Sequence, residues 1–267
     1  MHGECRGQDA DAREPGNVVH DGYGLAAAAA SVVHQACLHL NACIAQPTIK
    51  PMTILLIAGA TGLVGGHALR QTLADTRLAH VIAPTRRALS PHPKLVNPIV
   101  DFDGLPRDAP WWNVDAVVCA LGTTIKQAGS EAAFRKVDFD CVLDVARLAR
   151  LHGATRFALT SSLGANAMSR NFYLRTKGET ENALRECGFA SLTLVRPSMI
   201  GGERERVRPL EHMGMRAMRA LDPLIPRRYR VVPAERIAHA LVEAALAAAP
   251  GCAAIESEAL QPIRASA

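Results

Sequence analysis

The sequence predicts an α/β fold, in which a doubly wound parallel sheet carries helices on both faces. Short apolar runs alternate, from Thr53 onward, with longer segments whose apolar residues recur at steps of three and four. This alternation of strand-like and helix-like patterns is typical of a parallel sheet. The first run, Ile54 to Ala58, is too short for a helix and stops at Gly59, which indicates a strand buried on both faces.

The expected elements follow one another in a regular order. Strands are predicted at residues 54–58, 80–84, 95–102, 114–121, 156–160 and 191–195, with a further short strand at 231–232. Helices are predicted directly after residue 62, over 134–148, over 173–187 and over 237–246. In the second of these helices, one core-facing stripe is formed by Phe134, Val137, Cys141, Val145 and Leu148. Ligands of such sheets bind beyond the carboxyl ends of the strands, so the residues that follow each strand are the functional candidates.

The bulk composition fits one large domain and argues against nucleic-acid binding. The chain has 267 residues, of which 49% are hydrophobic, enough for a sizeable core. The net charge is +5, but the basic residues are scattered and only 4% of residues are aromatic, which indicates solubility and affinity for anions. The seven cysteines have no framework spacing and predict reduced, mostly buried thiols in a cytoplasmic protein.

Residues 1–51 differ from the rest of the chain. They begin with an acidic stretch and continue with an apolar one, residues 24–45, that polar side chains interrupt. We expect an extension that is disordered or weakly helical, and a folded domain over residues 52–267. Because the apolar stretch follows an acidic leader and contains polar residues, neither a secretory signal nor a membrane span is predicted.

Four side chains in this extension are of types that bind zinc: His34, Cys37, His39 and Cys43. On a helix, His34 and Cys37 would share one face, whereas His39 and Cys43 would lie on roughly the opposite face. We therefore predict no metal site.

Three glycines at a three-residue spacing follow the first strand. At Gly59, Gly62 and Gly65 the missing Cβ atoms allow a tight turn, close approach of the backbone to a phosphate, and close packing of helix on strand. The pyrophosphate of a dinucleotide would bind at the N-terminus of the following helix. The spacing from the first glycine to the second is one residue longer than in the common dinucleotide-binding fingerprint. The alternative to a dinucleotide site is a glycine-rich turn that binds nothing.

The second predicted strand ends in Thr85-Arg86-Arg87. Sites for NAD usually place an acidic residue here for the ribose 2′-hydroxyl, whereas arginine suits a 2′-phosphate through planar, charge-assisted contacts. The sequence therefore favours NADP(H) over NAD(H). The alternative is that Arg86 and Arg87 only solvate a loop, since the chain is rich in arginine.

An acid–base pair is predicted after the fifth strand, which ends at Ser161-Ser162. Tyr173 and Lys177 are four residues apart, so a helix would place phenol and ammonium on one face. A nearby lysine cation stabilises a phenolate, which makes Tyr173 a competent general acid or base. Ser162 could hydrogen-bond a substrate carbonyl, and Lys177 could also reach the nicotinamide ribose. The alternative is a surface tyrosine that happens to lie near a lysine.

Taken together, these motifs resemble one known family. The residues concerned are Gly59 to Gly65, Arg86-Arg87, Leu121-Gly122, Val137-Asp138, Ser161 to Ala165, Tyr173 to Glu179 and Arg196-Pro197. Over about residues 53–250 the chain resembles the Tat-interacting-protein group of atypical short-chain dehydrogenases. The resemblance implies an NADP(H)-binding Rossmann domain with a Ser-Tyr-Lys site. Two positions depart from the pattern: Asp138 stands where many short-chain dehydrogenases have Asn, and Arg204 follows Gly201-Gly202-Glu203 where an acidic-Arg pair is frequent.

The expected catalytic residues are Ser162, Tyr173 and Lys177. Either Ser161 or Ser162 could supply the hydroxyl, and similarity to extended family members favours Ser162. By position or by resemblance, the expected cofactor contacts are Gly59, Thr61, Gly62, Leu63, Val64, Gly65, Arg86, Arg87, Asp101, Phe102, Leu121, Gly122, Thr123, Ser161, Tyr173, Lys177, Pro197 and Arg204.

Three functional hypotheses follow. The leading one is an NADP(H)-dependent oxidoreductase that moves a hydride between nicotinamide and a small carbonyl or alcohol, with Tyr173 as general acid or base. Members of the group also serve as regulators, so the second is a non-catalytic NADP(H) sensor that binds a protein partner. The third, a sugar-nucleotide epimerase or dehydratase, is disfavoured because the segment after Lys177 is short for a large lid.

Substrate recognition is expected in residues 201–230, a small segment that would cover the site. Met213, Met215 and Met218 would give this segment a pliable apolar wall, although such methionines are more often core. We expect a monomer or homodimer that binds a small-molecule substrate, and neither nucleic acid nor membrane.

Overall fold

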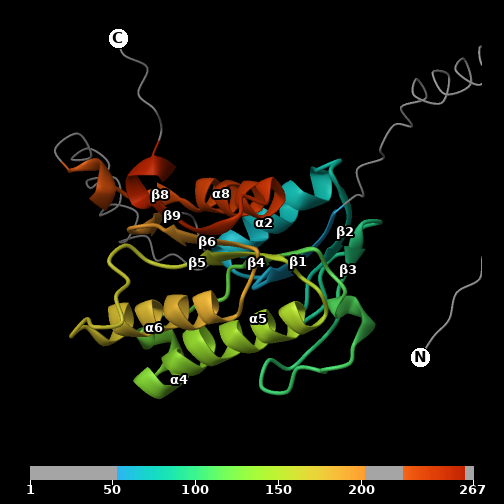
Figure 1. The fold of residues 1–267 in the computed structure, drawn as a ribbon, viewed down its shortest axis with the longest axis horizontal. Coiled ribbons are helices and arrows are strands. Elements are labelled where there is room, and N and C mark those ends of the chain that lie inside the picture. Colours follow the sequence, from blue (N-terminus) through green and yellow to red (C-terminus); the bar gives the residue numbers. More distant parts are fainter. Residues whose placement is uncertain (1–52, 202–224, 262–267) are drawn as a thin grey trace, which may run out of the picture. The chain divides into compact units, whose positions relative to one another are not determined.

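A seven-stranded sheet forms the centre of the computed structural model, which describes residues 53–201 and 225–261 (Figure 1). Residue contacts divide the chain into residues 1–50 and 51–267, and all described residues belong to the second unit. Along the sheet the strands are β3 (Leu95–Val96), β2 (Leu78–Ile82), β1 (Thr53–Ala58), β4 (Ala116–Cys119), β5 (Arg156–Thr160), β6 (Ser191–Arg196) and β9 (Gly251–Glu256). All neighbouring pairs are parallel, which confirms the predicted doubly wound α/β fold.

Helices cover both faces of this sheet (Figure 1). One face carries α2 (Leu63–Ala74) and α8 (Ala234–Ala247), and the other carries α4 (Glu131–Arg135), α5 (Cys141–Leu151) and α6 (Phe172–Glu186). In β1, Leu55 and Ile57 belong to the core under α2 and α8, whereas Leu56 and Ala58 belong to the opposite core. This alternation explains why the first strand reads as an unbroken apolar run.

Several shorter elements complete the described chain. A separate two-stranded parallel pair consists of β7 (Ile200–Gly201) and β8 (Val232–Pro233). The remaining turns of helix are η1 (Pro110–Trp112), α3 (Ile125–Ala128), η2 (Lys136–Asp140), η4 (Arg227–Tyr229) and η5 (Ser257–Leu260). Of these, η2 is a π-helical turn that joins α4 to α5.

The structure corrects several predicted boundaries. The third strand is only two residues long, because Pro98 lacks the N–H that a continued ladder needs, and pairing resumes as a single bridge between Thr85 and Ile99. The second strand begins and ends two residues earlier than predicted, and the fourth is shorter at both ends. The predicted helix over 134–148 is divided into α4, η2 and α5.

One strand of the sheet was not predicted. β9 pairs with β6 from Ser191↔Gly251 to Arg196↔Glu256 and forms an edge of the sheet. Four of its residues, from Gly251 to Ala254, are exposed, so the segment lacks the apolar run that marks the inner strands.

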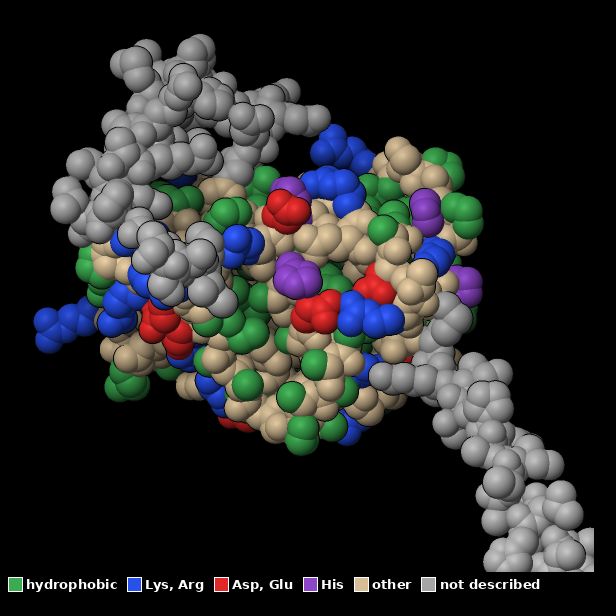
Figure 2. All heavy atoms as spheres, turned by 90° about the horizontal axis from the view of Figure 1, so that it is seen from above, with side chains coloured by type: hydrophobic (Ala, Val, Ile, Leu, Met, Phe, Trp, Pro, Cys, Tyr) green, Lys and Arg blue, Asp and Glu red, His purple; other side chains and the backbone are tan. Residues whose placement is uncertain are grey.

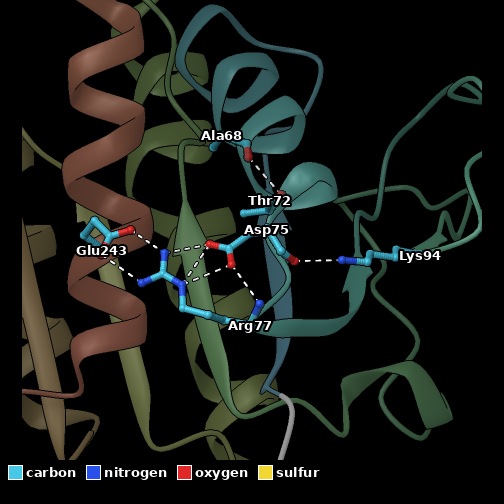
Figure 3. A network of polar contacts seen from close by, with 6 residues as sticks. All are labelled: Ala68, Thr72, Asp75, Arg77, Lys94 and Glu243. Carbon is cyan, nitrogen blue, oxygen red and sulfur yellow. Dashed lines mark hydrogen bonds and ion pairs between the residues drawn. The ribbon is translucent and has the colours of Figure 1, made fainter.

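At the opposite end of the sheet from the strand carboxyl ends, an ion-pair network links α2 to α8 (Figure 3). Arg77, directly before β2, lies 2.6 Å from Asp75 Oδ2 and 2.5 Å from Glu243 Oε1 of α8, while Lys94 Nζ donates to Asp75 O at 2.7 Å. The hydrogen bonds from Arg77 lower the pKa of Asp75. Because the Arg77 side chain is 52% exposed, each pair should contribute at most about 1 kcal/mol and weaken with salt.

The surface over α2 and α8 shows no concentration of one charge. Viewed from this side, basic, acidic and histidine side chains are intermixed over the described residues (Figure 2). Within residues 53–201 and 225–261, no helix has the length and hydropathy required to cross a membrane. The same ranges contain no group of three or more His, Cys, Asp or Glu side chains arranged to hold a metal ion, and the four zinc-type residues of the N-terminal extension lie outside them.

Candidate active site

The strand order reverses between β1 and β4, and the candidate site lies where these two strands end. Gly59 follows β1 with a φ of +89°, and a Cβ atom there would lie 2.7 Å from the carbonyl carbon of Ala120. Only glycine fits both this backbone conformation and this close approach. The turn after β1 therefore lies directly against the loop after β4.

The glycine turn continues into the N-terminus of α2. Gly62 is the N-cap residue, its N–H donates to Gly59 O at 2.9 Å, and no side chain caps the helix. A Cβ atom at Gly65 would lie 2.0 Å from Gly59 O, so the helix packs on the turn as closely as backbone atoms allow. Thr61 and Gly62 are exposed. The N–H groups of the first turn have no acidic side chain beside them, an environment that suits a phosphate.

The other two residues predicted from this loop have a different role. Val64 is buried in the core under α2 and α8, and Leu63 packs against the same core. Their side chains hold the helix on the sheet, so only their backbone could face a ligand.

The loop after β2 presents two arginines to solvent. Arg86 and Arg87 are both exposed, and neither forms an ion pair with another residue of the described ranges. Asn97, which no sequence motif marks, fixes this loop: its Nδ2 donates to Thr85 Oγ1 at 2.8 Å and to Ala83 O at 2.5 Å. Thr85 Oγ1 in turn donates to Arg87 O at 2.7 Å. The arginines thus stand on a braced loop.

Asp101 and Phe102, predicted near the adenine, are both engaged locally. Asp101 is exposed, and its Oδ1 accepts from Asp103 N at 3.0 Å within a turn. Phe102 is half-buried and packs against the core under α5. Neither contact assigns a cofactor role to these residues.

The loop after β4 lies beside the acid–base residues. Gly122 is exposed, and a Cβ atom there would lie 3.3 Å from Asp138 Oδ1 and 3.8 Å from Lys177 Nζ. Thr123 N donates to Asp138 Oδ2 at 2.8 Å. Leu121, half-buried, packs on the core. The structure therefore brings Gly122 and Thr123 together with Lys177.

The two serines after β5 have different environments. Ser161 Oγ donates to Glu181 Oε1 at 2.6 Å, and Glu181 is also bound by Arg196, whose Nη2 lies 2.5 Å from Oε2. Glu181 is buried, and Arg196 also binds Glu256 of β9 at 2.9 Å. Ser162 Oγ has one long contact, 3.4 Å to Leu163 O. Ser161 belongs to a buried network, whereas the Ser162 hydroxyl, also buried, has only this one long contact among the described residues.

Pro197 acts through its backbone. It is buried, and its carbonyl oxygen accepts from Leu163 N at 2.8 Å, so the segment after β6 holds the loop that carries Ser162. Arg204 and the methionines Met213, Met215 and Met218 lie outside the described residues.

Tyr173 and Lys177 lie one turn apart on α6, which begins at its N-cap Asn171. The half-buried Tyr173 ring is 5.4 Å from the ring of Phe134, measured between centroids. Lys177 is buried, with Nζ 2.7 Å from Asp138 Oδ1 and 3.5 Å from Thr160 O at the end of β5. Burial is the largest single influence on Lys177 and by itself lowers its pKa, but the charge and hydrogen bond of Asp138, together with Tyr173 and Cys119, outweigh it, and the pKa is raised.

Asp138 was noted in the sequence only as a departure from a family pattern. Its side chain is fully buried in the π-helical turn η2. A sequence signal does exist, because Asp138 lies on the apolar stripe that starts at Phe134, where an acidic residue is costly unless paired. Such π-helical turns occur often at functional sites.

An open groove lies away from this site. It is lined by residues near the C-terminal ends of α5 and α6: Arg147, Arg150, Leu151, Ala183, Glu186 and Cys187. These residues precede β5 and β6 and therefore lie toward the opposite end of the sheet from Ser162 and Lys177.

Comparison with known proteins identifies relatives of this chain and structures that share its fold. No family model matches the chain. It is 34% identical over 169 residues to the mitochondrial protein fmp52 of Emericella nidulans, covering 60% of this chain and 72% of the relative. It is 36% identical over 162 residues to Protein HTATIP2 of Rattus norvegicus, covering 59% of this chain and 66% of the relative.

Solved structures share the fold. MoeE5 in complex with UDP-glucose and NAD has a TM-score of 0.59 at 17% identity, covering 75% of this chain and 74% of that chain. The Bordetella bronchiseptica enzyme WbmH in complex with NAD+ has a TM-score of 0.56 at 18% identity, covering 77% of this chain and 75% of that chain.

The fold defines the chain as a Rossmann-type protein. Within this class, the chain belongs to the family of Fmp52 and HTATIP2, an atypical group, as the sequence motifs predicted.

The predicted cytoplasmic location is contradicted by these relatives. The Fmp52 proteins of Emericella nidulans, Lodderomyces elongisporus and Aspergillus fumigatus are all named as mitochondrial. The prediction used the cysteine pattern, which reports reducing conditions and does not separate one reducing compartment from another.

Proposed function

We propose that this protein is an oxidoreductase that binds a nicotinamide dinucleotide and reduces a small carbonyl compound. The observation that carries the proposal is the contact of buried Lys177 with the end of β5, two residues before Ser162 and beside Gly122. Lys177 thereby connects the acid–base residues of α6 with the loop after β4. The glycine turn after β1 lies against that same loop.

The residues present fit the dinucleotide. At Gly59 and Gly65 the backbone leaves no space for a Cβ atom, and the uncapped N-terminus of α2 offers N–H groups for the pyrophosphate. A bound nicotinamide would supply the hydride that the carbonyl carbon accepts. The chain itself would supply the hydrogen-bond donor to the carbonyl and the proton that the carbonyl oxygen receives.

The chain's part in the reaction is to orient the carbonyl and supply one proton. Ser162 Oγ would donate a hydrogen bond to the carbonyl oxygen, and Tyr173 would give its hydroxyl proton to the same oxygen as the carbon is reduced. The phenolate left on Tyr173 would regain a proton from solvent, so the alcohol product carries one hydride and one proton. The Lys177 cation stabilises the phenolate in the interval.

The two serines offer a first test of these roles. Ser162→Ala should lower turnover by about 10²-fold, roughly the loss seen when one donor to a developing oxyanion is removed, with cofactor affinity little changed. Ser161→Ala should instead lower stability, by roughly 1–3 kcal/mol, because the buried Glu181 loses a partner. Steady-state kinetics and denaturant unfolding of both variants show which serine affects turnover and which affects stability. The reverse pattern would transfer the catalytic role to Ser161.

For the cofactor, we propose NADP(H), held through Arg86 and Arg87. Replacing both with Ala removes charge-assisted contacts worth roughly 1.5–3 kcal/mol each, so NADPH affinity should fall while NADH affinity changes little. Arg147 and Arg150, an exposed pair on α5 toward the opposite end of the sheet, serve as matched controls for the change in net charge. Equal losses for both cofactors, measured by fluorescence titration, would exclude recognition of a 2′-phosphate.

A non-catalytic cofactor sensor that binds a protein partner is the second candidate, and the relationship to HTATIP2 favours it. The two candidates separate in one assay, in which NADPH oxidation is followed over a library of aldehydes and ketones. Turnover that requires Tyr173 supports the oxidoreductase. Tight NADPH binding with no turnover across the library supports the sensor.

A further inference from the structure

Asp138 connects two parts of the candidate site through one side chain. Oδ1 lies 2.7 Å from Lys177 Nζ, and Oδ2 accepts from the backbone N–H of Thr123 at 2.8 Å. The backbone carbonyl of Asp138 accepts from Thr180 Oγ1 of α6 at 3.0 Å. The residue thus ties η2 both to the loop after β4 and to the helix that carries Tyr173 and Lys177.

The surroundings of Lys177 contain one strong countercharge. The groups that act on its ammonium are the Asp138 carboxylate from η2, the Tyr173 hydroxyl from its own helix, and the Cys119 thiol from β4. The Thr160 carbonyl at the end of β5 adds a weak contact at 3.5 Å. Both side chains of the ion pair are nearly inaccessible to water, at 6% exposure for Lys177 and 0% for Asp138. A buried ammonium is costly unless such a partner compensates it.

We propose that Asp138 is a positioning residue, whose carboxylate holds Lys177 in its charged form at the end of β5 and fixes the Thr123 loop beside it. The ion pair keeps a cation next to Tyr173 over the neutral and alkaline range, as the proton transfer needs. This consequence for catalysis rests on the function proposed above. The ion pair itself can be tested without any substrate.

The direct readout is the titration of Lys177 in the wild-type protein. The chain has only five lysines, so ¹³C labelling at lysine Cε gives a simple NMR spectrum, and a Lys177→Arg protein identifies the resonance. We expect Lys177 to keep its proton to a pH above the ordinary lysine value of about 10.4. The pair then stabilises the fold below that pH, and the contribution is lost as the pH rises through the raised pKa. A Lys177 that titrates at or below the ordinary value overturns the proposal.

Asp138→Asn isolates the charge. Asparagine has nearly the same size and keeps an oxygen for the Thr123 N–H, but it lacks the countercharge, so burial should move the Lys177 titration below the ordinary value. Asp140→Asn, at an exposed acid of the same η2 turn, is the matched control and should leave the Lys177 titration unchanged. An unchanged titration in Asp138→Asn overturns the proposal. If this variant does not fold, the wild-type titration alone decides.

Kinetic measurements then test the positioning role of Asp138 separately from the proposed carbonyl reduction. In Asp138→Asn the alkaline decline of kcat should move to lower pH by as many units as the Lys177 titration moves. A shifted titration in a protein without turnover on any carbonyl leaves the Asp138 assignment standing and removes the oxidoreductase. A wild-type enzyme that turns over, together with a variant whose kcat profile does not move, rejects the positioning role.

Discussion

Gly65→Ala should destabilise the protein by about 3 kcal/mol or more, at or beyond the upper end of the usual cost of overpacking. The added methyl group would lie 2.0 Å from Gly59 O and 2.6 Å from its carbonyl carbon, and both atoms belong to backbone that cannot rotate away. To relieve this contact, α2 must move off β1 and open the core under α8. For a domain of this size the loss corresponds to a Tm lower by roughly 6–12 °C.

The neighbouring glycine is a matched control. A Cβ atom at Gly66 would lie 3.6 Å from Ala60 O, an ordinary van der Waals distance, inside the same helix. Since alanine in a helix is favoured over glycine by roughly 0.5–1 kcal/mol, Gly66→Ala should be neutral or stabilising. Denaturant unfolding, with an unchanged m-value, measures the free energy of unfolding of both variants. Equal stability of the two variants would show that the helix can shift without cost, contrary to the geometry.

Gly65→Ala should also weaken the dinucleotide site. The turn that would hold the pyrophosphate is closed by the approach of Gly65 to Gly59 O, and shifting α2 displaces the N–H groups of its first turn. NADPH affinity should therefore fall in Gly65→Ala at temperatures where the variant is still folded, and remain intact in Gly66→Ala.

The features of the fold that sequence patterns predict are those set by local chemistry. The strand–turn–helix unit from Thr53 was predicted because an apolar run, three glycines and a helical pattern occur in order, and the structure confirms the parallel sheet built from such units. The strand β5 and the helix α6 were predicted to within one residue at each end. In each case, an apolar pattern that predicts burial ends at a clear turn signal in the sequence.

The features that were missed depend on tertiary contacts. The strand β9 has four exposed residues and is a strand because β6 offers a free edge, which no local pattern reports. The π-helical turn at Asp138 arises where a buried carboxylate must reach Lys177 and Thr123 together. A regular 3.6-residue period could not anticipate that turn.

Sequence patterns propose the candidate site as a set of positions, but they do not report which of its side chains pair with one another. Ser161 and Ser162 are alternatives in the sequence, and the hydrogen bond from Ser161 to Glu181 could not be predicted because the acceptor lies 20 residues further along the chain. Similarly, Asn97 braces the loop of Arg86 and Arg87 from a neighbouring strand segment. Hydrogen bonds between residues distant in sequence decide which side chains remain available to a ligand.

Tyr173→Phe should lower turnover by roughly 10²–10⁴-fold, the usual contribution of a general acid or base, and leave NADPH dissociation little altered. The variant removes one hydroxyl and keeps the ring, which packs 5.4 Å from Phe134, so α6 and the position of Lys177 should be preserved. Stability should therefore change by less than about 1 kcal/mol, well below the cost of truncating a buried ring.

The comparison variants for this prediction are Tyr23→Phe and Lys177→Ala. Tyr23→Phe is the same chemical change in the N-terminal extension and should leave kcat unchanged. Lys177→Ala leaves Asp138 as a buried carboxylate without its cation, so we expect stability, NADPH binding and rate to decline together. Tyr173→Phe is then the variant that separates chemistry from binding. Full activity of Tyr173→Phe on a carbonyl that the wild-type protein reduces would mean that the proton comes from another group, and Tyr173 would no longer be the proposed general acid.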